Sequence, residues 1–109
     1  MKSRDRHSNP AGEAECDALS EAFMAMHDAD EFRALLRDLT TPAELEALVD
    51  RWRVAQLLDA GLAYREIHDR TGVSVTTIGR VARFLEMGHG GYRLALDRIK
   101  NQRPEPLNR

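Results

Sequence analysis

Apolar residues recur along the chain at the three- and four-residue spacing that places them on one face of a helix. A first stripe begins near residue 15, and a second ends near Thr40. The polar segment 27–30 separates the two stripes, and its Asp28 or Asp30 can cap the helix that follows. The pattern therefore predicts two amphipathic helices, each of which buries one face.

A longer helix is predicted to begin at Thr41. Threonine at the cap, Pro42 at the first helical position and Glu44 three residues after the cap form a capping box, and Gly61 is a natural residue to follow the last turn. Its apolar residues cover more than one face: Leu45, Leu48, Val49, Trp52, Val54, Ala55, Leu57 and Leu58. Because a small monomer cannot bury so wide a surface, the pattern predicts partner contacts on two sides of this helix.

Segment 62–88 has the spacing of a helix-turn-helix motif. Gly72 stands where the turn requires a positive φ, and Ser74 can cap the second helix. Four apolar residues fall at inward positions: Ile67, Val73, Ile78 and Val81. Thr71 occupies the remaining inward position. His68 stands where a smaller residue is usual, and we expect it to lean outward at the rim.

The second helix of this pair is predicted to stop at the glycine-rich segment 88–91, before a short last helix with its own apolar stripe. The flanking segments 1–13 and 101–109 lack periodicity, so they are predicted to be a disordered N-terminal segment and a flexible tail. Residues 14–100 form a single domain in this interpretation. The sequence contains no strand signal, and the predicted fold is all-α with six helices.

The helix-turn-helix motif predicts DNA binding, because the outward side chains have the chemistry that this function needs. Three are predicted to read base edges: Thr76, Thr77 and Arg80. Four are predicted to hold phosphates: Tyr64, Arg65, Ser74 and Arg83. Two short helices around a glycine often only pack together, so spacing alone leaves a purely structural interpretation open.

The distribution of charge favours the DNA-binding interpretation. The net charge of −2 would be unfavourable if it were spread evenly. Residues 15–60, however, carry four Arg against eleven Asp and Glu, whereas residues 64–83 carry four Arg against two acidic residues and residues 89–109 carry five basic residues against two acidic ones. This segregation is the one expected of a basic DNA-binding surface on an otherwise acidic protein.

Length and composition exclude several other classes of protein. A chain of 109 residues with 42% hydrophobic residues is sufficient for one soluble domain. No apolar stretch is long enough to span a membrane and the polar start is not a signal peptide, so a cytoplasmic location is predicted. Cys16 is single, and the histidines are scattered: His7, His27, His68 and His89. No metal site is predicted, and because no nucleophile accompanies a base, neither is an enzyme.

Three segments, in this order, resemble the Trp-repressor superfamily and more closely its YerC/YecD type. They are LTTPAELEALVDRWRVAQLLDAGLAYREI at 39–67, TGVSVTTIGRVARFL at 71–85 and GHGGYRLALDR at 88–98. The resemblance covers roughly residues 30 to 100. It implies an intertwined homodimer in which each chain contributes one helix that recognises DNA. The wide apolar surface of the third predicted helix agrees with such a dimer.

The resemblance also indicates residues for a small-molecule effector. In tryptophan-sensing members, two arginines sandwich the indole, and the matching positions are Arg51 and Arg80; Thr41 matches a position near the amino acid. Val81 and Phe84 stand where such members keep small residues. Tryptophan is therefore not expected as corepressor, and no other effector is named. The alternative role for Arg51 is an ion pair with Asp50 or with an acidic residue of a partner.

The function predicted from these observations is that of a sequence-specific DNA-binding transcriptional regulator, a repressor that acts as a homodimer on a palindromic operator. The alternative is a dimeric helical protein-interaction module that has lost DNA binding.

Overall fold

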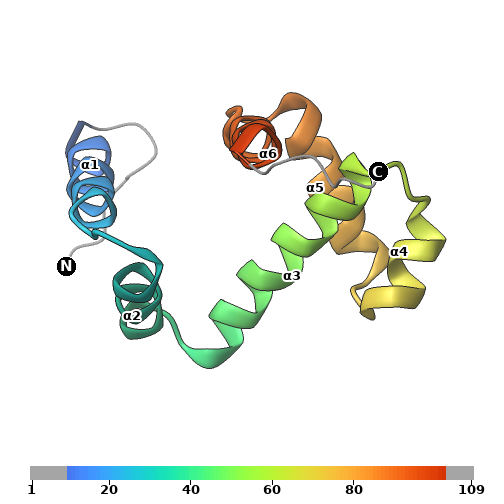
Figure 1. The fold of residues 1–109 in the computed structure, drawn as a ribbon, viewed down its shortest axis with the longest axis horizontal. Coiled ribbons are helices and arrows are strands. Elements are labelled where there is room, and N and C mark those ends of the chain that lie inside the picture. Colours follow the sequence, from blue (N-terminus) through green and yellow to red (C-terminus); the bar gives the residue numbers. More distant parts are fainter. Residues whose placement is uncertain (1–9, 103–109) are drawn as a thin grey trace. The chain divides into compact units, whose positions relative to one another are not determined.

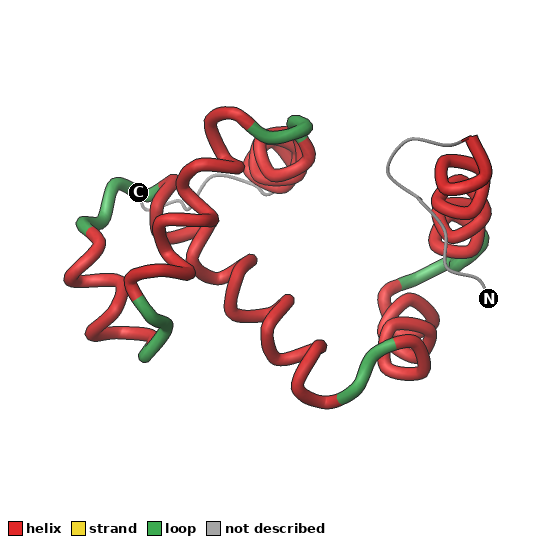
Figure 2. Tube along the Cα trace, turned by 180° about the vertical axis from the view of Figure 1, so that it is seen from behind, coloured by secondary structure: helices red, strands yellow, loops and turns green. Residues whose placement is uncertain are grey.

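The computed structural model of the chain describes residues 10–102 (Figure 1). Within these residues it contains six helices and no strand (Figure 2), so the predicted all-helical fold is confirmed. The helices are α1 (Pro10–Met24), α2 (Ala29–Leu39), α3 (Pro42–Asp59), α4 (Tyr64–Thr71), α5 (Val75–Met87) and α6 (Gly91–Gln102). The chain divides into two compact units, one up to Leu45 and one from Glu46.

In the first unit, α1 and α2 are joined by a short capped turn. Of the two candidate caps, Asp28 is the one used: it accepts a hydrogen bond from the backbone N–H of Glu31 at 2.9 Å. The rings of Phe23 and Phe32 stack with centroids 5.1 Å apart. Helix α1 begins at Pro10, earlier than the start near residue 15 that the apolar stripe predicts. Its first four residues, PAGE, contain none of the large apolar side chains that make up such a stripe.

Helix α1 thus includes residues 10–13, which the sequence interpretation assigns to a disordered segment. The rest of that segment, residues 1–9, lies outside the described residues. At the other end, α6 continues to Gln102 and so includes the first two residues of the predicted tail. Residues 103–109 of that tail lie outside the described residues.

Helix α3 begins and ends as its sequence predicts. The Thr41 hydroxyl accepts a hydrogen bond from the Glu44 N–H at 3.1 Å, and the Glu44 carboxylate accepts one from the Thr41 N–H at 2.9 Å, which completes the capping box. Gly61 follows the helix with a φ of 93°. Its N–H donates to Leu58 and the next N–H, of Leu62, donates to Leu57, the paired bonds of a Schellman C-terminus.

The core of the second unit lies where α4 and α5 pack against each other and against the C-terminal part of α3. In both ribbon and tube views α4 and α5 lie beside this end of α3 (Figures 1 and 2). The core cluster contains six buried residues: Val54, Ala55, Ile67, Val73, Ile78 and Val81. All four residues that the sequence places inward in segment 62–88 belong to it, so this prediction is confirmed.

The turn between α4 and α5 is held by a group of local hydrogen bonds. Gly72 has a φ of 75°, and its N–H donates to the carbonyl of His68 at 2.8 Å. The Thr71 hydroxyl donates to the Ile67 carbonyl at 2.7 Å and accepts from the Val73 N–H at 3.0 Å. Thr71 therefore satisfies two backbone groups in a position where an apolar side chain would satisfy none.

His68 lies at the exposed rim of this turn, as expected for a residue too large for the inner corner. Its Nδ1 lies 2.8 Å from the carbonyl of Val73. Because a carbonyl can only accept, Nδ1 carries the proton and donates to it. The imidazole thus links the end of α4 to the connection that leads into α5.

A charged cluster links the C-terminal end of α3 to α6. The Asp59 carboxylate accepts a hydrogen bond from the Arg93 guanidinium at 2.8 Å, and the Lys100 ammonium lies 3.3 Å from its other oxygen. The Asp59 side chain is only 17% exposed, and Arg93 also binds Asp97 at 3.0 Å. These bonds, that of Arg93 foremost and then that of Lys100, hold the pKa of Asp59 below its ordinary value of 3.8, although partial burial opposes the shift.

Asp59→Asn is expected to lower the free energy of unfolding by about 1 kcal/mol at neutral pH, the upper range for a partly exposed ion pair. Since the carboxyl pKa is lower in the folded state, Asp59 contributes stability above pH 3.8 that is lost as the pH falls through the folded-state pKa. Urea titrations at pH 7 and near pH 3 measure this. The difference between the wild type and the variant should shrink at the lower pH; an equal difference at both would show that the charge of Asp59 is not its cause.

Candidate nucleic-acid interface

The outward face of α5 presents three of the side chains predicted to contact DNA. Thr76, Arg80 and Arg83 are exposed and spaced four and three residues apart, so they share one side of the helix. Ile78 and Val81 lie on the opposite side, where both are almost completely buried in the core. The core contacts of α5 therefore direct this polar face into solvent.

Ser74 caps α5, as predicted. Its hydroxyl accepts the N–H of Thr77 at 3.1 Å and donates to the Thr77 hydroxyl at 3.1 Å. A serine hydroxyl has one proton, and here that proton is already engaged. Half-buried Thr77 retains its own hydroxyl proton, so of the two side chains Thr77 is the one that can donate to DNA without breaking the cap.

Tyr64 and Arg65 form the exposed first turn of α4. Ala63 stands at the cap of this helix, where it makes no side-chain capping bond. The first N–H groups of α4 are therefore not satisfied by a capping side chain. Free N–H groups at a helix start whose first turn also carries Arg65 form an environment that favours an anion such as a phosphate.

Arg80 lies over the ring of Phe84, one turn further along α5, with its guanidinium carbon 4.6 Å from the ring centroid. This distance is that of a cation–π contact. Neither Arg80 nor Arg51 forms an ion pair with another residue in the described range 10–102. The ion pair with Asp50, one of the two alternatives considered for Arg51, is thus not formed within these residues; an ion pair with a partner residue stays a prediction.

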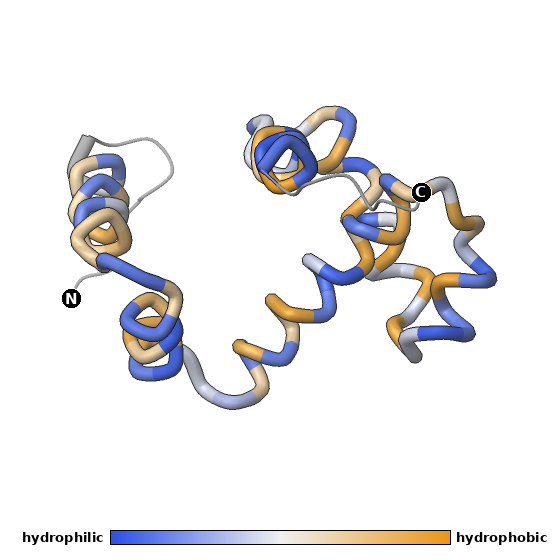
Figure 3. The backbone as a smooth tube through the Cα atoms, in the orientation of Figure 1, coloured by the Kyte–Doolittle hydropathy of each residue, from blue (hydrophilic) through white to orange (hydrophobic). Residues whose placement is uncertain are grey.

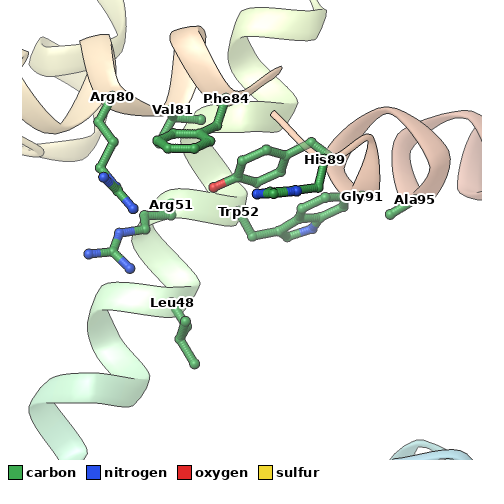
Figure 4. Close-up of a pocket in the computed structure, with 10 residues that line it drawn as sticks. Leu48, Arg51, Trp52, Arg80, Val81, Phe84, His89, Gly91 and Ala95 are labelled. Carbon is green, nitrogen blue, oxygen red and sulfur yellow. The ribbon is translucent and has the colours of Figure 1, made fainter. Parts of the chain in front are cut away.

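Arg51 and Arg80 line the same pocket, which has a volume of about 660 Å³ and lies in the second unit. The two arginines lie at one end of it, and Trp52 and His89 at the other (Figure 4). Trp52 stacks on Tyr92 with ring centroids 6.4 Å apart. Two guanidinium groups at one end and stacked rings at the other make a pocket chemically suited to a planar anion.

The third predicted effector residue, Thr41, belongs to the other unit, where its hydroxyl and N–H are both used to cap α3. Val81 and Phe84 both line the pocket that Arg51 and Arg80 share, which is called the arginine pocket below. The structure thus brings together Arg51 and Arg80 of the predicted effector residues.

A second hollow, of about 450 Å³, lies beside α5 in the same unit. Two of the residues predicted to hold phosphates, Tyr64 and Arg83, line it together with Gly79 of α5. Gly79 is not among the residues that the sequence predicts to contact DNA, because a glycine has no side chain that could make such a contact. The signal that was available is its position in the interior of a helix, where glycine is unfavourable.

Comparison with known proteins identifies the relatives of this chain. The family model described as Trp repressor protein matches residues 14–100. The chain belongs to the Trp repressor family. This family consists of regulatory proteins and not of enzymes, and the resemblance seen in the sequence is confirmed.

Individual members of the Trp repressor family match most of the chain. The uncharacterized protein YerC of Bacillus subtilis is 37% identical over 91 residues, which cover 84% of this chain and 88% of YerC. A crystal structure described as a "putative Trp repressor" from Staphylococcus aureus matches with a TM-score of 0.75 and 33% identity, over 80% of this chain and 87% of that one. A TrpR-like protein from Eubacterium eligens has a TM-score of 0.73 and 32% identity, over 81% and 91% of the two chains.

The described part of the chain lacks two further features. No helix there is both long and apolar enough to cross a membrane. Within the same residues, no three His, Cys, Asp or Glu side chains are grouped so that they could hold a metal ion.

Proposed function

We propose that the protein is a sequence-specific DNA-binding transcriptional repressor that acts as a homodimer on a palindromic operator. The observation that carries this proposal is the α4–α5 pair, in which Ile78 and Val81 hold α5 against the core while Thr76, Arg80 and Arg83 face solvent. A helix presented in this way can enter the major groove as the second helix of a helix-turn-helix. Membership of the Trp repressor family supports the proposal.

The proposed contacts divide into two groups. Thr76, Thr77 and Arg80 read base edges, since hydroxyl and guanidinium groups match the donors and acceptors of the major groove. Tyr64, Arg65, Ser74 and Arg83 hold phosphates. Among the second group Ser74 is the weakest, because its hydroxyl proton is already given to Thr77.

A homodimer is proposed because the chain exposes apolar surface along α3, where orange positions recur between blue ones (Figure 3). Leu48 is 43% and Val49 55% exposed, and Leu94 of α6 is 51% exposed. Residues of this kind are normally covered when they occur together, and a second copy of the chain would cover them. Two copies would also supply two reading helices.

The homodimer should unfold with a melting temperature that rises with protein concentration, because association adds to the stability of the folded state. Thermal melts followed by circular dichroism over a hundredfold range of concentration measure this. Sedimentation equilibrium gives the mass independently. A folded monomer at micromolar concentration with a constant melting temperature would contradict the dimer.

The DNA-binding proposal is tested with fragments selected by the full-length protein from random duplexes. We expect a palindromic site with half-sites about 34 Å apart, one turn of the double helix. Affinity should fall steeply with salt, because each phosphate contact makes the slope of log affinity against log salt concentration more negative by about 0.9. A salt-independent affinity, or protection of one asymmetric stretch in footprinting, would contradict the proposal.

The arginine pocket is not proposed as a tryptophan site. Phe84 and Val81 form part of its wall, and the Phe84 ring already lies against the guanidinium of Arg80. The ring thus already occupies one face of the Arg80 guanidinium, and an indole that stacked on that face would have to displace it. A small planar anion that binds beside Arg51 remains the class of effector that this pocket favours.

The second candidate function is a dimeric protein-interaction module that has lost DNA binding. The observation that favours it is the position of Arg80, which stacks on Phe84 and lines a pocket and therefore does not extend straight outward from α5. Failure to recover any duplex in the selection, at low salt and with a confirmed dimer, would favour this function over the first.

A further inference from the structure

Gly79 is an unexpected residue for its position in α5. It lies between Thr76 and Arg83 on the outward side of the helix, four residues from the N-terminal end and eight from the C-terminal end. Glycine in a helix interior is less favourable than alanine, because its backbone loses more freedom on folding. Its backbone is ordinary helix, without the positive φ that requires glycine at Gly61, Gly72 and Gly90.

The surroundings of Gly79 do not explain the missing side chain. A Cβ atom built at this residue would meet no atom within 4 Å, apart from its immediate neighbours and the backbone of its own helix. At Gly88, by contrast, a Cβ would collide with the backbone carbonyl of Phe84. Within the described residues, packing thus accounts for glycine at 88 but not at 79.

The space in front of Gly79 is a hollow lined by hydrogen-bond donors and by four apolar residues: Leu58, Ala82, Leu85 and Met87. The Tyr64 side chain, 42% exposed, and exposed Arg83 line it, and both carry N–H or O–H groups that can bind a phosphate. Glu86 lines it too, three residues beyond Arg83 toward the end of α5. An anionic strand is therefore best placed at the end formed by Gly79, Tyr64 and Arg83.

We propose that Gly79 is the point where DNA approaches the backbone of α5 most closely, and that its missing side chain lets one sugar–phosphate strand enter the hollow between Tyr64 and Arg83. The inference rests on the proposed DNA-binding function. It adds Gly79 to the interface as a residue that acts by leaving space. A side chain there would hold the strand away from both donors.

The test compares full-length wild type, Gly79→Ala and Gly79→Leu by fluorescence anisotropy on the duplex selected by the wild type and on a random duplex. Alanine favours the helix and meets free space, so the melting temperature should rise by roughly 4 °C. Affinity should nevertheless fall about tenfold on both duplexes, since the added methyl must displace the strand. Leucine, which is also a good helix former, should weaken binding further.

Ser20→Ala on α1 is the matched control, because it also favours the helix and replaces an exposed residue whose hydroxyl only donates to the Cys16 carbonyl. Its affinity should equal that of the wild type. A loss of binding in this control would attribute the effect at Gly79 to general stability and overturn the inference.

Three further results separate the inference from the function on which it rests. If Gly79→Ala is more stable but binds as tightly as the wild type, Gly79 has no role at the interface. If Gly79→Ala melts at a lower temperature than the wild type, the space is not free and the inference fails with it. If the wild type itself binds no duplex, the proposed function fails.

Discussion

Ile78→Ala is expected to lower the free energy of unfolding by roughly 2 to 5 kcal/mol. The Ile78 side chain is fully buried in the cluster shared by α3, α4 and α5, so its truncation removes apolar contacts and leaves a cavity that the helices cannot easily close. The same change should abolish DNA binding near the melting temperature of the variant, because the outward face of α5 is exposed to DNA only while the core is folded. Urea unfolding with and without operator DNA measures both effects.

Ile78→Val is the control for this prediction. It keeps the branched shape and removes one methylene, and a loss of only about 0.5 to 1.5 kcal/mol is expected. A near-neutral Ile78→Ala variant would show that α5 is not anchored through Ile78, and the orientation of its outward face would then have no structural basis.

The sequence was sufficient to predict features set by neighbouring residues. The capping box of Thr41 and Glu44, the cap at Ser74 and the positive φ of Gly72 each depend on a backbone group within a few positions. The inward residues of segment 62–88 were predicted equally well, because a helix of fixed period has only one side that can face its partner.

Features set by distant residues were not predicted. Asp59 and Arg93 are 34 positions apart, and nothing in their local sequence indicates that they form an ion pair. The contact of Arg80 with Phe84 was likewise not predicted, since a helical period fixes the direction of the Cα–Cβ bond of Arg80 but not where a long side chain ends. Only the packed structure places its guanidinium over Phe84, whereas the family resemblance had already indicated Arg80 and Arg51 as a pair.

Arg80→Ala is expected to reduce discrimination between the operator and a site with one half-site guanine replaced, by a factor that corresponds to roughly 1 to 3 kcal/mol. A bidentate arginine recognises the paired acceptors of guanine, so its removal affects the correct site more than the altered one. Arg65→Ala, at the first turn of α4, should instead weaken binding to both sites equally, because a phosphate contact carries no sequence information.

The contact with Phe84 makes the test of Arg80 sharper. To reach a base, the guanidinium must leave the ring, and an exposed cation–π contact contributes only about 0.5 to 1 kcal/mol. Phe84→Leu should therefore keep discrimination and change affinity by no more than a few-fold. If Arg80→Ala weakened both sites equally, Arg80 would position α5 or line the pocket beside Arg51, and base reading would rest on Thr76 and Thr77.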